Sequence, residues 1–198
     1  MKYLCLKSNE YKLKDYSIVP YRKKDIFYIM KWRNEQIEIL RQNKILTKEE
    51  QIAYYYNFIK PTFKEKTPKQ ILFSFLERKN CIGYGGLTNI DWINKKAELS
   101  FLLDTKRAKN ENTYEKDFSA FLFLIKKICF EELKLNRLFA ETYAFRKFHI
   151  SILEKNGFIY EGRLRQNVYK NNLFIDSYIH SILKIDYDKE IQRQESIY

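Results

Sequence analysis

The apolar residues change their spacing at Gln70, and this change constrains the fold more than any other feature of the chain. Before it, residues 25–34 and 48–59 repeat apolar side chains at helical spacing. After it, apolar and polar residues alternate in three short runs, which is typical of strands. Short connections between the runs predict antiparallel neighbours. The expected strands are 71–77, 81–89 and 97–103.

The order of the remaining segments predicts a mixed α/β domain on one central sheet. Residues 12–21 form the expected first strand, and Thr47 with Glu50 forms an expected capping box before the second helix. After residue 103, the pattern alternates helix and strand and ends in two strands. The expected segments are a helix at 118–133, a strand at 137–143 and a helix at 148–155 that Gly157 ends. We expect one domain over 1–186, followed by a charged, flexible tail at 187–198.

Composition narrows the class of protein. The chain has 198 residues, and its 45% apolar content is ample for one core. Since no run of about 18 uncharged apolar residues occurs, no transmembrane helix is expected. The apolar part of the N-terminus is too short for a signal peptide. The three cysteines are widely spaced and form no metal or disulfide pattern. A cytoplasmic protein without a metal is expected.

The formal charge of +12 indicates either anionic partners or a composition that is simply rich in Lys, Asn, Ile, Tyr and Phe. No block of about five consecutive Lys or Arg residues occurs. Neither nucleic acid nor a membrane is therefore expected as a partner. A small anionic molecule is the expected substrate, and a homodimer is one compatible assembly.

Three segments carry a family resemblance. They are Leu153–Phe158 (Leu-Glu-Lys-Asn-Gly-Phe), Glu161–Arg165 (Glu-Gly-Arg-Leu-Arg) and Phe130–Arg137 (Phe-Glu-Glu-Leu-Lys-Leu-Asn-Arg). Together they resemble the GNAT acyltransferases over about residues 10–185, closest to the ribosomal-protein alanine and amino-sugar acetyltransferases. The resemblance implies a mixed, mostly antiparallel sheet of about six to seven strands with about four helices. It also implies that acetyl-coenzyme A or another acyl-CoA is the acyl donor.

In that family the donor lies where two parallel strands separate, which here are residues 97–103 and 137–143. The resemblance implies pantetheine contacts with backbone groups of four consecutive residues: Ser100, Phe101, Leu102 and Leu103. The family's glycine-containing pyrophosphate loop falls on residues 113–118, which contain no glycine. Phosphate contacts are therefore expected from side chains instead, and the candidates are Lys106, Arg107, Lys109 and Arg146. The loop is degenerate by comparison with the family pattern.

Acyl transfer to an amine requires a base for the amine and a donor that stabilises the developing oxyanion. Glu98 lies where many relatives have an acidic residue, and it is the candidate base. A strand-surface Glu paired with Lys96 or Arg137 is the alternative. The candidate acids on the thiolate side are Tyr143, Ser151 and Tyr160.

The acceptor is expected beside the first two helices and the strand hairpins. Lys31–Asn34 resembles the Trp-Arg-Asn signature of acetyltransferases that act on amino-sugar nucleotides, so Trp32, Arg33 and Asn34 are substrate candidates. Trp32 as a core anchor is the alternative. Tyr84, within Gly83–Gly86, is expected beside the acceptor. Asp176 and His180 share a strand face and either line an acceptor pocket or form a polar patch. His149 is interpreted as structural.

We therefore expect an N-acetyltransferase for a primary amine on a small anionic molecule, such as a nucleotide-linked amino sugar. Glu161–Arg165 favours a second function, N-terminal acetylation of a ribosomal protein. A third alternative is a non-catalytic GNAT-fold binding module that has lost its donor site.

Overall fold

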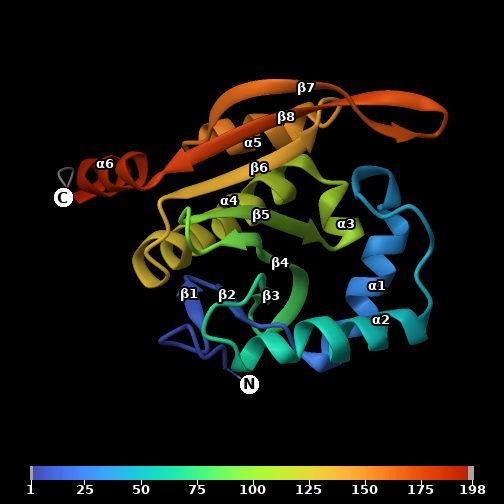
Figure 1. Cartoon of the computed structure of the whole chain (residues 1–198), viewed down its shortest axis with the longest axis horizontal. Coiled ribbons are helices and arrows are strands. Elements are labelled where there is room, and N and C mark those ends of the chain that lie inside the picture. The colour runs from blue at the N-terminus through green and yellow to red at the C-terminus, as the bar shows by residue number, and fades with distance from the viewer. Residues whose placement is uncertain (1, 196–198) are drawn as a thin grey trace.

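The computed structural model describes residues 2–195, and side chains as far as Gln192. Eight strands form one sheet in the order β1-β2-β3-β4-β5-β6-β8-β7 (Figure 1). The strands are β1 (Tyr11–Leu13), β2 (Tyr16–Pro20), β3 (Ile71–Glu77), β4 (Asn80–Asp91), β5 (Lys96–Leu103), β6 (Arg137–Tyr143), β7 (Ile159–Lys170) and β8 (Leu173–Leu183). The helices are α1 (Ile26–Glu35), α2 (Lys48–Tyr54), α3 (Thr105–Ala108), α4 (Glu111–Lys127), α5 (Lys147–Lys155) and α6 (Lys184–Glu195).

The predicted mixed, mostly antiparallel sheet is confirmed, with one strand more than expected. Residues 12–21 form two strands rather than one, because the chain turns back between Leu13 and Tyr16, where Lys14 has a φ of 52°. The additional helices are α3 and α6. The expected capping box is present, since Thr47 Oγ1 accepts from Glu50 N at 3.2 Å and Glu50 Oε2 accepts from Thr47 N at 3.0 Å.

Helix α4 begins earlier than predicted. Asn110 is its N-cap, and Asn110 Oδ1 accepts from Thr113 N at 2.9 Å. The polar first turns of the helix carry no apolar repeat, so the sequence pattern became visible only at Phe118. Residues 113–118 consequently lie inside the helix, and the prediction that they form the pyrophosphate loop was wrong. The segment that connects β5 to α4 is 104–110.

The C-terminal segment also differs from the expected flexible tail. Helix α6 continues from β8 as far as Glu195. Tyr187 is buried against Phe130, with ring centroids 5.1 Å apart. Lys126 Nζ, on α4, donates to Glu190 Oε2 at 2.7 Å. The segment is rich in charged residues and was therefore predicted to be flexible. The Tyr187–Phe130 contact and the Lys126–Glu190 ion pair attach it to the domain as α6.

Glycines allow β3, β4 and β5 to approach closely, because a glycine within a strand leaves room for a neighbouring backbone. Gly86 has a φ of +151°, and a Cβ atom there would lie 2.1 Å from the carbonyl oxygen of Ile71. A Cβ atom at Gly85 would lie 2.1 Å from the carbonyl oxygen of Ser100. These glycines therefore place β5 tightly against the centre of the sheet.

Strands β5 and β6 are parallel neighbours that pair only at their beginnings within the described chain. The paired residues are 96–98 of β5 and 137–139 of β6. Beyond Glu98 and Phe139 the two strands separate, while β5 stays paired with β4 as far as Leu103. The carboxyl ends of the two strands therefore border a gap in the sheet.

Candidate active site

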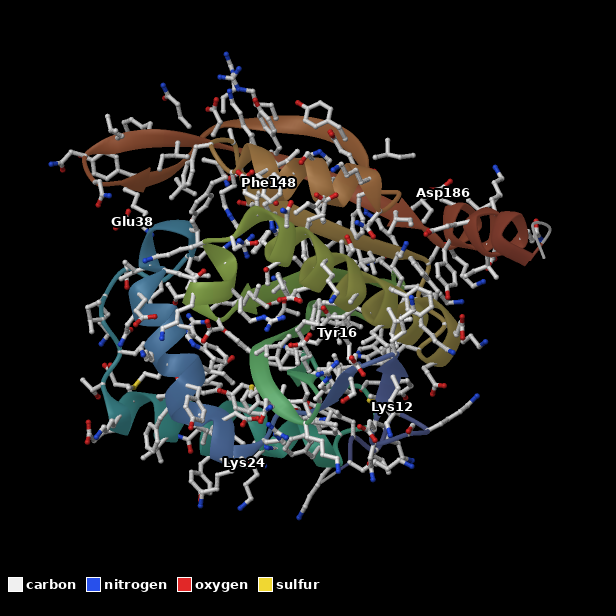
Figure 2. The ribbon with its side chains drawn as sticks, turned by 180° about the vertical axis from the view of Figure 1, so that it is seen from behind. Lys12, Tyr16, Lys24, Glu38, Phe148 and Asp186 are labelled. Atoms are coloured by element: carbon white, nitrogen blue, oxygen red, sulfur yellow. The ribbon has the colours of Figure 1, made fainter. Side chains whose placement is uncertain are left out.

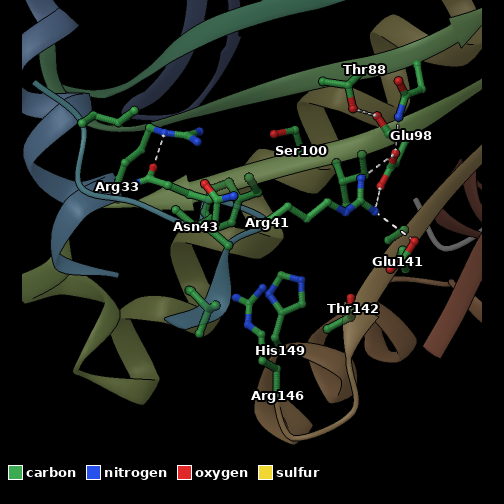
Figure 3. Close-up of a pocket in the computed structure, with 18 of the residues that line it drawn as sticks. Arg33, Arg41, Asn43, Thr88, Glu98, Ser100, Glu141, Thr142, Arg146 and His149 are labelled. Atoms are coloured by element: carbon green, nitrogen blue, oxygen red, sulfur yellow. Dashed lines mark hydrogen bonds and ion pairs between the residues drawn. The ribbon is translucent and has the colours of Figure 1, made fainter. Parts of the chain in front are cut away.

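A cavity of about 530 Å³ occupies the gap between β5 and β6 (Figure 3). It is lined by β5 and β6, by the start of α5 and by the segment between α1 and α2. The polar lining residues are Arg33, Arg41, Gln42, Asn43, Lys44, Thr88, Asn89, Glu98, Ser100, Glu141, Thr142, Arg146 and His149. Four of these side chains are cationic and two are carboxylates.

The separation of β5 from β6 leaves backbone groups of β5 available to a ligand. Asp104 N donates to Ile82 O at 2.7 Å. In an antiparallel pair every second residue is hydrogen-bonded to the partner strand, so on β5 these residues are Leu102, Ser100 and Glu98. By this alternation, Leu99, Phe101 and Leu103 direct their N–H and C=O groups to the opposite edge, toward the gap. The backbone groups of Ser100 and Leu102 face β4 instead, so the prediction that they contact pantetheine was wrong. Gln36 Nε2 already donates to Leu103 O at 2.8 Å from that side. An extended ligand can therefore pair with the edge as an additional strand would.

Glu98 projects into the cavity, as the candidate base requires. Its carboxylate is 8% exposed and accepts from Arg41 Nη2 at 2.6 Å and from Asn89 Nδ2 at 2.6 Å. Arg41 Nη2 also donates to Glu141 Oε2, on β6, at 3.0 Å. The expected alternatives, pairing of Glu98 with Lys96 or Arg137, do not occur. No sequence pattern indicated Arg41, because the segment that carries it has no regular structure.

A chain of hydrogen bonds links α4 to the start of α5. Arg146 Nη2 donates to the Tyr114 hydroxyl at 3.1 Å, and this hydroxyl lies 2.8 Å from His149 Nδ1. The ring tautomer decides which of these two groups donates in the bond between them. Burial, together with the charge of Arg146, holds the pKa of His149 well below its usual value of 6.5. His149 thus presents an imidazole that favours its neutral form at the cavity, a placement that sequence reasoning missed.

Arg33, on α1, lines the cavity. Its Nε donates to Gln42 Oε1 at 3.1 Å, and its Nη1 donates to the Tyr84 hydroxyl. No carboxylate pairs with Arg33 within the described residues. Arg33 and Tyr84 also line a smaller adjoining cavity of about 180 Å³, together with Tyr21 and Tyr54.

The rest of the Trp-Arg-Asn segment supports the site without facing it. Asn34 Oδ1 accepts from Leu46 N at 2.9 Å and from Gln42 Nε2 at 3.0 Å, which holds the segment after α1 in place. Trp32 is 4% exposed and stacks on Tyr28, away from the cavity. The structure therefore agrees with the core-anchor alternative for Trp32.

Three of the four basic residues expected at the phosphates lie near the start of α4, and these three have different surroundings. Arg107 is bound by two carboxylates, Asp117 and Glu77, so its guanidinium is already occupied. Lys106 and Lys109 are exposed beside the beginning of α4. Neither ammonium has a partner in the described part of the chain. Two of the three candidates thus remain available to an anionic group.

The candidate acids do not gather at one point. Tyr143, at the end of β6, lines a neighbouring cavity under the hairpin of β7 and β8, and burial raises the pKa of its hydroxyl. Ser151 Oγ donates to Phe148 O at 2.9 Å within α5. Tyr160 lies on β7, half exposed, against Tyr178. Of the three, Tyr143 is nearest to the site.

Asp176 and His180 do not line the main cavity. Asp176 accepts from Gln166 N at 2.7 Å and pairs with Arg163. His180 is fully buried beside Tyr160, with Nε2 at 3.4 Å from Glu154 Oε1. Asp176 is thus paired within the β7–β8 hairpin, whereas His180 is buried against β7 and α5.

Among residues 2–195, no three His, Cys, Asp or Glu side chains come together as a metal site would require. Within the same range, none of the helices combines the length and apolarity needed to cross a membrane.

Comparison with known proteins agrees with this geometry. Residues 18–179 match the acetyltransferase (GNAT) domain family. The chain therefore belongs to the GNAT acetyltransferases. It is an N-acetyltransferase of the GNAT type, with acetyl-coenzyme A or another acyl-CoA as the acyl donor. No curated protein matches the sequence significantly.

Solved structures share the fold at low identity. One is spermidine N-acetyltransferase from Vibrio cholerae in complex with CoA and spermine, with a TM-score of 0.76 and 17% identity over 88% of this chain and 99% of that chain. A dodecameric structure of the Vibrio cholerae enzyme has a TM-score of 0.70 and 17% identity, over 88% of this chain and 97% of that chain. A protein described as a probable GNAT acetyltransferase from Chromobacterium violaceum has a TM-score of 0.73 and 14% identity, over 91% of this chain and 88% of that chain.

The residues present fit this donor. The free edge of β5 offers paired N–H and C=O groups to a pantetheine arm. At the start of α4, the N–H groups of Glu111 and Asn112 have no acceptor within the described chain. Such groups bind phosphate at a helix N-terminus. When bound, acetyl-CoA supplies an activated acyl carbonyl, and the remaining work of the site is to position and deprotonate an amine.

Proposed function

We propose that the chain acetylates the primary amine of a small molecule that also carries an anionic group. The observation that carries this proposal is the charge of the cavity, which has four cationic side chains and two carboxylates. Arg33 in particular has no carboxylate partner in the described residues. A unit negative charge about 4 Å from such a guanidinium gains about 4 kcal/mol at an effective dielectric constant of about 20. A nucleotide-linked amino sugar meets these requirements.

In this proposal the residues have separate roles. Glu98 removes the proton of the amine, directly or through a water molecule, because its buried carboxylate faces the cavity. Arg33 binds the anionic group with the help of Tyr84. His149 presents its imidazole to the cavity from the side of α5. Lys106, Lys109, Arg146 and the N-terminus of α4 hold the donor's phosphates, which replaces the family's glycine loop.

A polyamine acceptor is the second candidate. Its support is the fold shared with the Vibrio cholerae enzyme, whose structure contains spermine, together with the carboxylates of Glu98 and Glu141. The cationic excess of the cavity opposes it, since spermidine carries several positive charges and no anionic group. Acetylation of a ribosomal-protein N-terminus stays a third hypothesis, and a homodimer stays a prediction.

An acceptor panel tests the proposal. Acetyl-CoA would be incubated with the purified chain and one of four amines: a nucleotide-diphosphate amino sugar, the free amino sugar, spermidine or a peptide with an N-terminal Ala. Thiol release and product mass would be measured. We expect kcat/KM for the nucleotide-linked sugar to exceed that for the free sugar by at least tenfold. Arg33→Gln should remove most of this preference. Lys31→Gln is the control, because Lys31 is exposed on another side of α1, and this variant should preserve the preference. A preference for spermidine would overturn the proposal.

A further inference from the structure

The Arg41 guanidinium lies between two carboxylates that belong to the two separated strands. Nη2 of Arg41 donates to Glu98 Oε1 on β5 at 2.6 Å and to Glu141 Oε2 on β6 at 3.0 Å (Figure 3). We propose that Glu98 and Glu141 form the subsite for the acceptor's ammonium group, and that Arg41 occupies this subsite until the acceptor displaces it. This inference rests on the proposed function, because it names where the amine of that acceptor binds.

The two carboxylates have the properties of a prepared cation subsite. The side chain of Glu98 is 8% exposed and that of Glu141 is 18% exposed. An asparagine orients each of them, since Asn89 Nδ2 donates to Glu98 Oε2 at 2.6 Å and Asn167 Nδ2 donates to Glu141 Oε1 at 2.7 Å. Two poorly hydrated carboxylates that share one donor repel each other unless a cation lies between them. A cation between the two carboxylates is therefore favoured, whether it comes from the chain or from a ligand.

Arg41 is held less firmly than the carboxylates that it joins. Its side chain is 54% exposed, and it lies in residues 40–47, which contain no helix or strand. An exposed cation can exchange its protein partners for water at little cost. Glu98 and Glu141, in contrast, lie on strands of the sheet and cannot follow it. The arrangement favours departure of Arg41 and replacement by another cation.

The tip of the β7–β8 hairpin holds the segment that carries Arg41. Lys170 Nζ donates to the carbonyl oxygens of Ile37, of Leu40 at 2.9 Å and of Gln42 at 3.4 Å. Asn171 Nδ2 donates to Glu38 Oε2 at 2.7 Å, and Figure 2 shows Glu38 beside this hairpin. These contacts lie at both ends of Arg41 and are independent of Glu98. Lys170 is thus a positioning residue that keeps Arg41 at the subsite.

A primary ammonium is the chemical class that fits the vacated subsite. It presents three N–H donors, which can satisfy both carboxylates and leave one direction toward the cavity. The adjoining Phe101 belongs to the β5 edge that receives the donor. An amine held by Glu98 and Glu141 would consequently lie beside that edge, with Arg33 farther along the same cavity for the anionic group.

Binding of a simple cation tests the inference without acyl transfer. Ethylammonium chloride would be titrated into wild type and Arg41→Met in the absence of acetyl-CoA, and its Kd measured by ligand-detected NMR. Tetramethylammonium chloride at equal ionic strength is the control, because it has no N–H donor. We expect Arg41→Met to bind ethylammonium at least tenfold more tightly than wild type. Adding Glu98→Gln to Arg41→Met should abolish this gain.

Two further variants make the result decisive. Lys170→Met should also improve ethylammonium binding, by about threefold, because the segment that carries Arg41 then loses its contacts with Lys170. Since this variant retains Arg41, it tests the inference even if Arg41→Met fails to fold. Lys44→Met is the matched control, since Lys44 lines the same cavity but pairs with Glu50 and should give no gain. Equal Kd values in wild type, Arg41→Met and Lys170→Met would overturn the inference. Failure of the acceptor panel would leave these values unaffected, so the two proposals fail separately.

Discussion

Arg107 and Asp117 form a two-pronged ion pair that joins α3 to α4. Arg107 Nε donates to Asp117 Oδ2 at 2.6 Å, and Arg107 Nη2 donates to Asp117 Oδ1 at 2.9 Å. Asp117 is fully buried and also accepts from the Tyr16 hydroxyl at 2.8 Å, while Glu77 accepts from Arg107 Nη1 at 3.0 Å. The arginine that the sequence suggested for phosphate binding thus stabilises the segment on which the donor's phosphates would lie.

Removal of one partner should destabilise the domain strongly. Asp117→Ala leaves Arg107 with one carboxylate and the Tyr16 hydroxyl without its acceptor. Breaking such a buried pair typically costs about 3–5 kcal/mol. Urea unfolding followed by circular dichroism would measure the loss. Asp188→Ala, which breaks the partly exposed Lys184–Asp188 pair on α6, should cost no more than about 0.5 kcal/mol. Similar losses in the two variants would contradict the structural role of Asp117.

The fold was predictable where apolar periodicity was continuous. Strand β6 lies at Arg137–Tyr143, as its alternation predicted, and the Thr47 capping box begins α2. The start of α4 was not predictable from that pattern, because its first turns are polar and Asn110 supplies the cap. Helix α6 was missed for a similar reason, since a buried pair between Lys126 and Glu190 resembles ordinary surface charge in a sequence.

The site was predictable in its strands but not in its loops. Glu98 and Ser100 line the cavity because the alternation of β5 places both side chains on one face. Arg41 and Tyr114 reach the site only through tertiary packing, and neither belongs to a recognisable spacing. His149 resembled a structural residue because apolar neighbours flank it. Long-range contacts such as Arg146 with Tyr114 determine its role, and one sequence does not show them.

Lys106 and Lys109 should contribute to donor binding without contributing to stability. Both are exposed beside the start of α4 and have no partner within the described residues. Changing both to Ala should raise the Kd for coenzyme A about tenfold, which corresponds to about 1.4 kcal/mol. Isothermal titration calorimetry at two salt concentrations would measure the change. Lys64→Ala with Lys66→Ala, in the loop before β3, is the charge-matched control. An unchanged Kd in the Lys106 and Lys109 variant would exclude these side chains from the phosphate site.

Replacement of Glu98 by Gln should impair turnover while the fold is retained. The Gln side chain can still accept from Asn89 Nδ2, but it cannot remove a proton from the amine. General-base catalysis typically contributes 10²–10⁴-fold, so we expect kcat to fall by at least about 10²-fold at pH 7. Steady-state kinetics with the best acceptor of the panel would show it.

Glu141→Gln is the comparison for this variant, because Glu141 contacts the same Arg41 nitrogen. We expect it to raise the KM of the acceptor with a much smaller change in kcat. If both variants lowered kcat alike, Glu98 would have no special role as the base.

Acidification should destabilise the domain through His149. Its pKa in the folded chain is far below the usual 6.5, because the ring is buried and Arg146 lies nearby. The unfolded chain binds a proton at this residue near pH 6.5, whereas the folded chain does not. Below about pH 6.5, the free energy of unfolding should therefore fall as the pH falls, by up to about 1.4 kcal/mol per pH unit.

The variant His149→Gln isolates this contribution. Its amide oxygen can accept from the Tyr114 hydroxyl, and the side chain does not titrate. Urea unfolding at about pH 7.5, 6.5, 5.5 and 5.0 should show a flatter pH dependence below pH 6.5 than in wild type. The chain has two histidines, and His180 is present in both proteins, so the difference between the curves belongs to His149. Parallel curves would mean that His149 protonates in the folded chain as readily as in the unfolded chain, and the lowered pKa would then be wrong.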